Sequence, residues 1–257
     1  MNKNIYLSVI VPSYNETENL QRGVLGQVRD YLEKQTYLWE VIVSDDGSVP
    51  EAKNLARGFC EKNKGFAFLE NKHGGKIFAV WSGVQKAKGE VVLLTDMDQS
   101  TPISEIEKIL PYYQENYDIV IGSRGTDRKN YSLLRRVGSV IFKLFRQSLV
   151  LPKIIDTQAG FKSFKLEVGL KVFPKLQIIR QGNIGVKGWS VGSWDAEFLF
   201  IADKLGFKIK EVPILWENRD MATDTKKSSG SKYLRESVEM VEQTLRVRFN
   251  DLKGYYR

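Results

Sequence analysis

Residues 91–98 read Val-Val-Leu-Leu-Thr-Asp-Met-Asp, a short apolar run that ends in two carboxylates. Consecutive branched apolar residues are typical of a strand that is buried on both faces of a sheet. The polar residues begin where this strand is expected to stop. The stretch therefore predicts a buried β-strand with Asp96 and Asp98 at its carboxyl end.

Similar runs recur on both sides of this stretch, at residues 5–11, 39–44, 66–70 and 118–122. Each run is followed by a segment with helical periodicity, and an alternation of strand and helix is typical of βαβ units. We expect an α/β fold with a Rossmann-like, mostly parallel central sheet flanked by helices.

The composition excludes several classes of protein. The chain has 257 residues, a formal net charge of +8, one cysteine (Cys60) and one histidine (His73). An intramolecular disulfide, a cysteine-based zinc site and a multi-histidine metal site are therefore excluded. No run of about 18 apolar residues occurs, and residues 1–12 do not resemble a secretory signal, so we expect a cytoplasmic or peripheral protein. The positive charge favours anionic partners such as phosphates, nucleic acid or an acidic membrane face.

Polar residues follow four of the predicted strands. In a parallel sheet, ligands bind at the carboxyl ends of the strands, so these residues are expected to form the site. The four segments are Pro12-Ser-Tyr-Asn-Glu16, Asp45-Asp-Gly-Ser48, Asp96-Met-Asp98 and Gly122-Ser-Arg124.

Asp96 and Asp98 are the sharpest chemical signal. Two carboxylates that are two residues apart beyond a strand can converge on one hard divalent cation. Mg²⁺ or Mn²⁺ bound in this way would neutralise a leaving diphosphate. The alternative is a solvated turn, which the position between a buried strand and Ser100-Thr-Pro102 makes less attractive.

The segment containing Asp45 and Asp46 allows two interpretations. Asp-Gly is a common turn and Ser48 a common helix cap. Alternatively, a carboxylate here accepts a hydrogen bond from the imide N–H of a nucleobase. In that case Tyr14 packs against the base, and Glu16 contacts the ribose or the base.

Residues 71–76, Asn-Lys-His-Gly-Gly-Lys, precede a helix that is expected to begin near Ile77. Gly74 and Gly75 would let an anion approach the backbone N–H groups, and Lys76 adds a positive charge. The spacing differs from a Walker A loop, and no G-x-G-x-x-G follows a strand. His73 has the features of an ordinary loop histidine.

Taken together, the motifs resemble glycosyltransferase family 2, and within it the polyprenyl-phosphate sugar transferases. The resemblance extends from about residue 5 to about residue 215 and implies the nucleotide-sugar-binding GT-A fold. The ordered motifs that carry it are Val11-Pro-Ser-Tyr-Asn-Glu16, Asp45-Asp-Gly-Ser48, Gly74-Gly-Lys76, Asp96-Met-Asp98, Gly122-Ser-Arg124 and Asp156-Thr-Gln-Ala-Gly-Phe-Lys162.

The resemblance also implies residue roles. For the nucleotide sugar these are contacts by Pro12, Tyr14 and Glu16, base binding by Asp46 with Asp45 beside it, and metal binding by Asp96 and Asp98. Arg124 matches an arginine associated with phosphate binding. Lys76 belongs to the same nucleotide-sugar site, but Gly74-Gly-Lys76 departs from the family's Gly-Lys-Gly, which leaves its exact role open. Asp156 matches a position linked to the sugar or to catalysis, and an ordinary turn aspartate is the alternative. Ser100 stands where mannosyl enzymes often have Gln, so the resemblance does not support a third protein ligand for the metal.

The implied reaction moves a hexose from a nucleotide diphosphate to a polyprenyl (dolichyl or undecaprenyl) phosphate with inversion. A phosphate monoester is mostly dianionic at neutral pH, so the acceptor needs no general base. We expect Arg124 and one or both of Arg135 and Arg136 to bind the acceptor phosphate. The motif that begins at Asp156 slightly favours UDP-glucose as donor.

The chain beyond residue 130 changes in character. Residues 132–149 predict a basic amphipathic helix, and residues 181–192 and 221–231 predict loops. We expect a catalytic domain over residues 1–225 and an amphipathic helical extension of it over residues 226–257. Both amphipathic segments could lie on an anionic membrane leaflet at the cytoplasmic face, or could be solvated faces of core helices.

Four other functions compete with this interpretation. Two are a GDP-mannose-dependent polyprenyl-phosphate mannosyltransferase and a family 2 transferase with a glycan hydroxyl as acceptor. A basic nucleic-acid-binding protein is a third, but the positive charge is spread along the chain and no recognition motif occurs, so we expect no nucleic-acid partner. A silent nucleotide-sugar binder is the fourth, and the intact pair Asp96 and Asp98 argues against it.

Overall fold

The computed structural model describes residues 4–124, 147, 149–182, 194–217, 219 and 230–256 of the chain. These residues form one seven-stranded sheet of order β3-β2-β1-β4-β6-β5-β7, in which only β6 runs antiparallel to its neighbours. The strands are β1 (Leu7–Ser13), β2 (Trp39–Asp45), β3 (Phe66–Glu70), β4 (Val91–Leu94), β5 (Ile119–Ser123), β6 (Lys162–Lys165) and β7 (Ile209–Pro213).

The five strands predicted from apolar runs are confirmed to within two residues at each end. Strands β6 and β7 lack such a run, since Lys-Ser-Phe-Lys contains no aliphatic residue and the two aliphatic residues of Ile-Lys-Glu-Val-Pro are separated by two charged ones. Their place in the sheet comes from pairing with β4 and β5.

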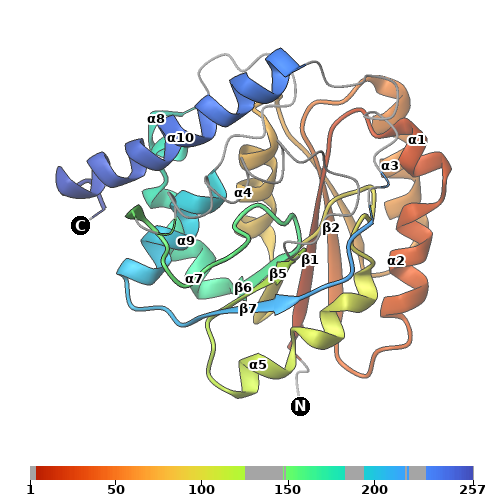
Figure 1. Ribbon diagram of the computed structural model, residues 1–257. Helices are drawn as coiled ribbons and strands as arrows, with labels where there is room; N and C mark the ends of the chain where they lie inside the picture. Colours follow the sequence, from red (N-terminus) through yellow and green to blue (C-terminus); the bar gives the residue numbers. More distant parts are fainter. Residues whose placement is uncertain are drawn as a thin grey trace.

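Helices cover both faces of the sheet (Figure 1). Within the described residues the α-helices are α1 (Thr17–Gln21), α2 (Val24–Leu32), α3 (Pro50–Lys62), α4 (Lys76–Lys86), α5 (Pro111–Gln114), α7 (Leu166–Val172), α8 (Gln177–Gln181), α9 (Trp194–Lys204) and α10 (Gly230–Leu252). The 3₁₀ segments are η1 (Ile103–Lys108) and η2 (Phe173–Lys175).

Alternation along the strands produces two hydrophobic cores, because successive side chains point to opposite faces. Val9 belongs to the core beneath α2, α3 and η1, whereas Ile10 belongs to the core beneath α4, α7 and α9. In β4, Val91 and Leu93 face the first core and Val92 the second. Both faces of the central strands are therefore shielded from solvent, which explains why these strands are mainly apolar.

The parallel strands bring the predicted motifs to one edge of the sheet. In Figure 1, β1 runs upward from the amino terminus, so its carboxyl end and those of the strands parallel to it lie at the top. Strand β6 runs in the opposite direction, so its first residue, Lys162, is paired with Leu94 at the same end. Lys162 and the residues after β4 are therefore neighbours.

Several predicted segments lie outside the described residues. Almost all of the predicted helix over residues 132–149 does so, as do most of the predicted loops over residues 181–192 and 221–231 and the predicted boundary after residue 225. The helix predicted near the carboxyl terminus is confirmed as α10, which begins at Gly230.

Candidate functional site

The loop after β1 is tied to the loop after β2. The backbone N–H of Asn15 donates to Ser48 Oγ at 2.9 Å, and the N–H of Val49 donates to Asn15 Oδ1 at 2.8 Å. Asn15 adopts a left-handed conformation with a φ of 57°, which asparagine tolerates better than most residues. The first two predicted motifs thus form one rigid unit.

Asp46 is completely buried and binds the glycine loop. Its carboxylate accepts hydrogen bonds from the N–H groups of Gly74 and Gly75, both at 2.8 Å, and lies 2.9 Å from His73 Nδ1. Burial raises the pKa of Asp46, against the opposing effect of these donors. The sequence predicts that a ligand anion approaches the glycine pair, whereas in this structure both N–H groups are occupied by the Asp46 side chain.

Asp45 and Ser13 face each other in the register of β1 and β2. Asp45 Oδ2 accepts hydrogen bonds from the N–H groups of Gly47 and Ser48, both at 3.1 Å, which is the turn that the sequence offers as one interpretation. Among the described residues, Asp45 Oδ1 and Ser13 Oγ are buried and have no hydrogen-bond partner. Both oxygens are enclosed by protein, and an unpaired buried oxygen is costly.

Tyr14 stacks on His73, with ring centroids 4.5 Å apart and the planes 19° from parallel. The ring is therefore placed beside the loop that covers Asp46. Glu16, the other predicted nucleotide contact in this segment, accepts a hydrogen bond from Asn19 Nδ2 at 2.6 Å. The structure thus brings Tyr14, Asp45 and Asp46 together and places Glu16 at the start of α1.

Asp96 lies between cationic groups. Its carboxylate forms an ion pair with Lys76, the first residue of α4. Burial acts to raise the pKa of Asp96, but Lys76, Lys162 and Arg124 outweigh it and the pKa is lowered. The side chain is 41% exposed, so it is still reachable from solvent. Asp96 is a permanent anion at a site surrounded by positive charge.

Gly160 makes room for this carboxylate. A Cβ atom on Gly160 would lie 1.9 Å from Asp96 Oδ2, far inside van der Waals contact. The glycine of the segment 156–162 is therefore required by the side chain of another motif. This steric requirement was not among the sequence predictions, because it exists only when β6 is placed beside β4.

Asp98 is oriented by its own turn. Its carboxylate accepts hydrogen bonds from the N–H of Ser100 at 2.8 Å and from Ser100 Oγ at 2.7 Å. Gln99 has a φ of 51° and donates from Nε2 to Thr95 Oγ1 at 3.1 Å. Arg22 donates to the carbonyl oxygen of Asp98 at 2.9 Å. Gln99 and Ser100 thus shape the acidic turn.

Lys162 is a site residue to which the sequence assigned no role. It is 1% exposed, and its ammonium group forms an ion pair with Asp195 Oδ1 at 2.7 Å and donates to the carbonyl oxygen of Ala159. A cavity of about 160 Å³ lies beside it, lined by Pro12, Lys76, Asp96, Gln158, Lys162 and Asp195 among others. The sequence alone does not indicate that a lysine at the start of a short strand points into a site.

Asp195 and Glu197, two acidic residues in the first turn of α9, lie in different surroundings. Asp195 lines the cavity, whereas Glu197 is buried on the other side of α9. Glu197 Oε1 accepts hydrogen bonds from Tyr256 Oη at 2.7 Å and from the N–H of Gln177 at 3.0 Å. Glu197 therefore holds the carboxyl-terminal segment against the body.

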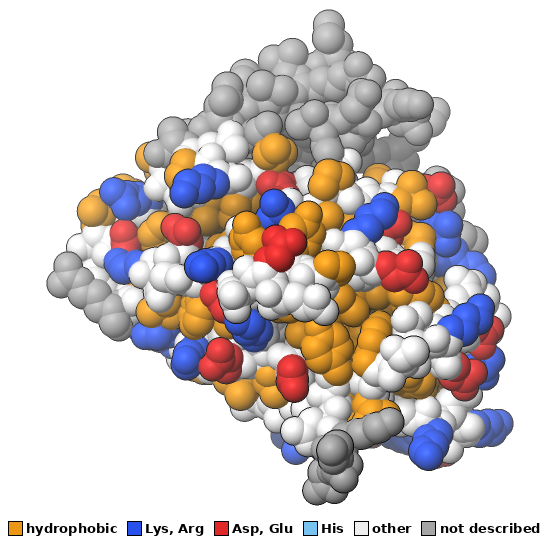
Figure 2. All heavy atoms as spheres, turned by 90° about the horizontal axis from the view of Figure 1, so that it is seen from below, with side chains coloured by type: hydrophobic (Ala, Val, Ile, Leu, Met, Phe, Trp, Pro, Cys, Tyr) orange, Lys and Arg blue, Asp and Glu red, His pale blue; other side chains and the backbone are white. Residues whose placement is uncertain are grey.

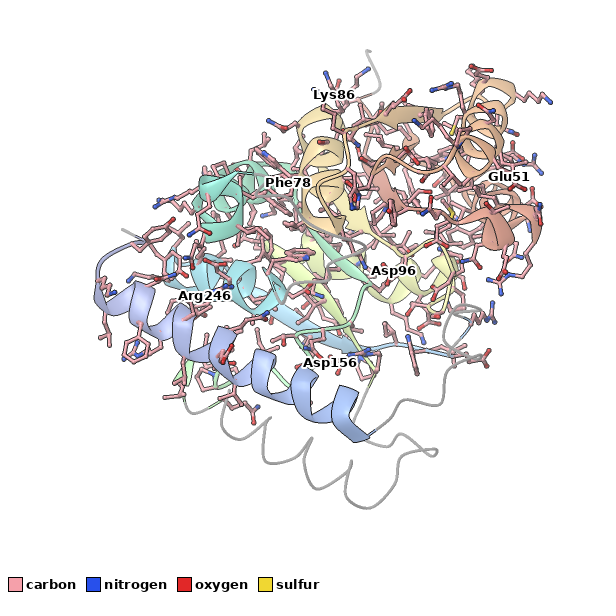
Figure 3. All side chains as sticks on the ribbon, turned by 90° about the horizontal axis from the view of Figure 1, so that it is seen from above. Glu51, Phe78, Lys86, Asp96, Asp156 and Arg246 are labelled. Carbon is pink, nitrogen blue, oxygen red and sulfur yellow. The ribbon has the colours of Figure 1, made fainter. Side chains whose placement is uncertain are left out.

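Asp156 is bound by Arg124 in a bidentate pair. Arg124 Nε and Nη2 donate to the two carboxylate oxygens at 2.8 and 2.9 Å, and the N–H of Gln158 also donates to Oδ1 at 3.1 Å. Burial acts to raise the pKa of Asp156, but the bonds from Arg124 outweigh it and hold the pKa well below its usual range. The Arg124 guanidinium lies 5.7 Å from the Trp216 ring centroid. Figure 3 shows Asp96 and Asp156 on the upper side of the molecule.

Arg135 and Arg136, the other predicted acceptor-phosphate ligands, lie outside the described residues. Their predicted role stays a prediction. Pro12 is described, and it lines the cavity beside Lys76.

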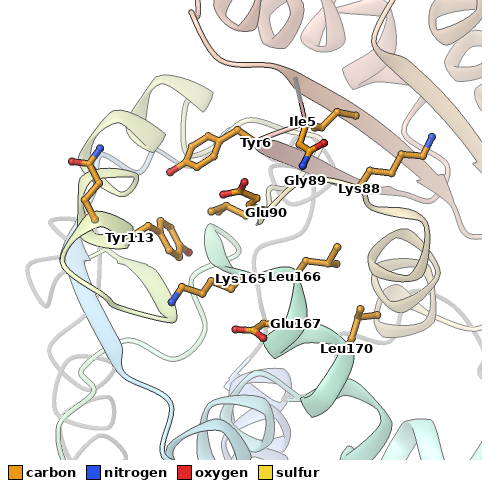
Figure 4. A pocket seen from close by; sticks show the side chains of 13 residues that line it. Ile5, Tyr6, Lys88, Gly89, Glu90, Tyr113, Lys165, Leu166, Glu167 and Leu170 are labelled. Carbon is orange, nitrogen blue, oxygen red and sulfur yellow. The ribbon is translucent and has the colours of Figure 1, made fainter. Parts of the chain in front are cut away.

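A second cavity, of about 760 Å³, lies at the opposite end of the sheet. It is lined by residues that precede β1 and β4, by residues of α5 and by the end of β6 and the start of α7, including Tyr6, Glu90, Tyr113, Lys165 and Leu170 (Figure 4). Figure 2, seen from below, shows hydrophobic side chains in the middle of this lower face. None of the predicted site residues lines this cavity.

None of the helices among the described residues combines the length and the hydropathy needed to cross a bilayer.

Comparison with solved structures identifies the fold. Glucosyl-3-phosphoglycerate synthase from Mycobacterium tuberculosis, solved with Mn²⁺, UDP-glucose and phosphoglyceric acid, superposes with a TM-score of 0.64 at 16% identity, over 96% of this chain and 79% of that one. Mannosyl-3-phosphoglycerate synthase from Rubrobacter xylanophilus superposes with a TM-score of 0.63 at 16% identity, over 97% and 75%. The fold is the GT-A fold.

Comparison of sequences identifies the family. A dolichyl-phosphate beta-glucosyltransferase from Dictyostelium discoideum is 32% identical in an alignment that covers 99% of this chain and 77% of that protein. The enzyme of that name from Mus musculus is 33% identical, over 82% of this chain and 67% of its own length. The family model described as glycosyl transferase family 2 matches residues 8–171. This chain therefore belongs to glycosyltransferase family 2.

Proposed function

We propose that the protein transfers a hexose, glucose from UDP-glucose, to a polyprenyl phosphate. The observation that carries the proposal is the cluster of Asp96 with Lys76 and Lys162 at the carboxyl edge of the sheet. This cluster occurs in a chain that aligns over 99% of its length with a dolichyl-phosphate beta-glucosyltransferase. A site of this kind suits two negatively charged substrates, a nucleotide diphosphate and a phosphate monoester.

The donor would extend from the loop around Asp45 and Asp46 to the cavity beside Asp96. Tyr14 offers a ring for the base, and Asp45 Oδ1, which is buried and has no hydrogen-bond partner among the described residues, would accept a nucleobase N–H once the loop above it moves aside. Lys76 adds a cation for the diphosphate at the first turn of α4. These contacts would place the anomeric carbon over the cavity that Lys162 and Asp195 line.

The acidic turn fits a divalent cation that the donor shares. The described residues contain no group of three or more histidine, cysteine, aspartate and glutamate side chains that could hold a metal. Mg²⁺ and Mn²⁺ are commonly bound by one or two carboxylates together with substrate phosphates, which suits Asp96 and Asp98. When bound, the metal ion would neutralise charge on the leaving diphosphate. Asp96 already holds a cation, the Lys76 ammonium, so its position is suitable.

The carboxylates of the site favour a phosphate acceptor over a hydroxyl acceptor. A hydroxyl nucleophile needs a general base with a pKa near the working pH. Asp156 has a lowered pKa and both oxygens bound, Asp195 is paired with Lys162, and Asp98 is bound by Ser100. Among the described residues, none of these three is free to act as a base, whereas a dianionic phosphate needs none.

Asp156 would then act as a positioning residue. By holding two nitrogens of Arg124, it fixes the guanidinium at the end of β5. Arg124, with one or both of Arg135 and Arg136, would bind the acceptor phosphate and bring it toward the anomeric carbon. Charge neutralisation and positioning are what the reaction between two anions requires.

The proposal is tested with purified full-length protein, a short polyprenyl phosphate, Mn²⁺ or Mg²⁺, and a panel of nucleotide sugars. Release of the nucleoside diphosphate is expected with UDP-glucose and only when both the acceptor and the metal ion are present. The variants Asp96→Asn and Asp98→Asn are expected to lower turnover by at least about 100-fold. Asp30→Asn, at an exposed carboxylate of α2, is the matched control.

Three results would contradict the proposal. Undiminished turnover in Asp96→Asn and Asp98→Asn would remove the role of the acidic turn. A preference for GDP-mannose would change the donor, and equal transfer to a sugar hydroxyl would change the class of acceptor.

Because the proposed acceptor is a lipid, we also propose that the protein works at a membrane surface, on its cytoplasmic face.

A further inference from the structure

The last three turns of α10 have two different faces. Thr244 and Val247 are 3% and 1% exposed and face α9 and the core. Leu245, Phe249 and Leu252 are 36%, 57% and 66% exposed. Spacings of four and three residues place these three side chains on one side of a helix. We call them the outer stripe of α10.

The outer stripe is held in a fixed orientation. Tyr256 Oη donates to the buried Glu197 at 2.7 Å, and Asn250 Nδ2 donates to Gln177 Oε1 at 2.8 Å. Arg180 stacks on Tyr255 at 4.5 Å and donates to the Tyr255 carbonyl oxygen at 3.0 Å. These contacts lock the inner face of the helix to α8 and α9, so rotation cannot bury the outer stripe.

Positive charge accompanies the stripe. Residues 241–257 include four basic residues and two acidic residues, Glu242 and Asp251, of which Glu242 is exposed. Arg246 and Lys253 are exposed, and Asp251 is already paired with Lys204 and Arg248. An apolar face with a basic margin is typical of helices that lie in the interface of an anionic membrane.

The position of α10 suits the same surface. In Figure 1 it runs along the upper side of the molecule, and Figure 3, seen from above, shows it together with Asp96 and Asp156. The helix therefore lies on the side of the molecule where the strands carry their site residues.

We propose that Leu245, Phe249 and Leu252 form a membrane-docking face that inserts into the headgroup region of an anionic bilayer. This inference rests on the proposed function, because it explains how a site for a lipid phosphate meets its acceptor.

A second copy of the chain fits the outer stripe less well than a membrane does. Two outer stripes packed together would bring the basic margins of both helices close to each other, and like charges repel.

The test is flotation of the full-length protein with vesicles of phosphatidylcholine and phosphatidylglycerol in equal amounts. The wild-type protein is expected to float. The double variant Phe249→Glu/Leu252→Glu is expected to reduce the bound fraction at least about tenfold, because its charged side chains cannot enter the apolar layer. Leu170→Glu is the matched control, since Leu170 is 45% exposed on α7 at the lower cavity.

A second variant keeps the test independent of folding defects. Arg246→Glu leaves the outer stripe intact, and it is expected to weaken flotation with anionic vesicles several-fold and to leave binding to pure phosphatidylcholine vesicles unchanged. Failure of the wild-type protein to float, or equal flotation of the double variant, would overturn the proposal. So would a dimer in sedimentation that the double variant dissociates.

Turnover separates this inference from the proposed function. With a short, water-dispersed polyprenyl phosphate, the double variant is expected to match the wild-type protein, and with a long polyprenyl phosphate in vesicles it is expected to lose most activity. If the wild-type protein turns over the short acceptor and does not float, only the docking face is refuted. If it turns over neither acceptor, the proposed function fails.

Discussion

Lys76 forms an ion pair with Asp96, the carboxylate that is also proposed to bind the divalent cation. Burial acts to lower the pKa of Lys76, but Asp96 outweighs it and the pKa is raised. If Asp96 binds a divalent cation, the Lys76 ammonium group must move away from the carboxylate. It would then pair with the diphosphate of the bound donor. Lys76 and the metal ion therefore compete for one carboxylate.

This competition predicts the behaviour of Lys76→Met. Without the donor, Mn²⁺ is expected to bind the variant about fivefold more tightly than the wild-type protein, which corresponds to a partly exposed ion pair of about 1 kcal/mol. Free Mn²⁺ measured by electron paramagnetic resonance gives the affinity. Lys86→Met, at the exposed end of α4, is the control. Equal or weaker Mn²⁺ binding by Lys76→Met would show that the two cations do not compete.

The pair of Arg124 and Asp156 predicts a pH-dependent stability. The pKa of Asp156 is lowered in the folded protein. Its contribution is therefore fully present above the unfolded value, about 3.9, and is lost as the pH falls through the lowered value. Asp156→Asn is expected to reduce the free energy of unfolding by about 3 kcal/mol at pH 7, because it removes one partner of a buried pair.

Urea unfolding of this variant and the wild-type protein at several pH values is the measurement. The difference between them is expected to be constant from pH 7 to about pH 5 and to shrink below about pH 4. Asp203→Asn, at an exposed aspartate of α9, should show neither effect. A difference that stays the same in strong acid would mean that the charge of Asp156 contributes nothing.

At the scale of elements, strand β6 decides the shape of the site. It runs against β4 and β5 and so delivers Lys162, Gly160 and Gln158 to the edge where the other strands end. The close approach of Gly160 to Asp96 is the tightest consequence of this arrangement. A side chain there would push Asp96 out of its position.

Gly160→Ala is therefore expected to lower turnover at least about tenfold and to weaken Mn²⁺ binding in the presence of the donor, because misplaced groups lose catalysis steeply. Gly26→Ala is the matched control. Nothing lies within 4 Å of a Cβ at Gly26 in α2, so that variant should keep its activity and gain as much as about 1 kcal/mol of stability. Turnover and titration calorimetry distinguish the two variants, and equal activity in both would contradict this account of the glycine.

At the scale of the whole molecule, a buried hydrogen bond contributes to the attachment of the carboxyl-terminal segment. Tyr256 is 1% exposed and donates to Glu197, which is itself buried in α9. Burial and the carboxylate of Glu197 raise the pKa of Tyr256, so its hydroxyl stays protonated and can donate. Because α9 begins with Trp194 and Asp195 at the site, this contact joins α10 to the helix that lines the cavity.

Tyr256→Phe is expected to cost about 2 kcal/mol in the free energy of unfolding, since it removes a hydrogen bond to a buried charged group. The amides of residues 241–252 should also exchange faster with solvent deuterium. Tyr255→Phe keeps the ring that stacks on Arg180 and serves as the control. If both variants were equally stable and equally protected from exchange, the Tyr256 hydroxyl would not hold α10.

The amino-acid sequence by itself determined the parallel part of the fold and the motifs at its edge. Strands β1, β4 and β5 are buried at every residue, and a continuous apolar run such as Val91–Leu94 is therefore readable without a structure. The loops after these strands must lie at one edge, which is why Asp46 and Asp96 could be assigned to a site. The glycine pair at the start of α4 was likewise predicted to receive an anion.

Only the tertiary structure decided which groups those residues meet. The binding of Asp46 to the glycine pair, of Asp96 to Lys76, and of Asp156 to Arg124 each joins residues at least 20 positions apart in the chain. The placement of the polar strands β6 and β7 also came from pairing rather than from periodicity. Side-chain partners across a sheet depend on register and direction, which local sequence does not encode. For that reason Lys162, buried and paired with Asp195, became a site residue only when β6 was placed beside β4.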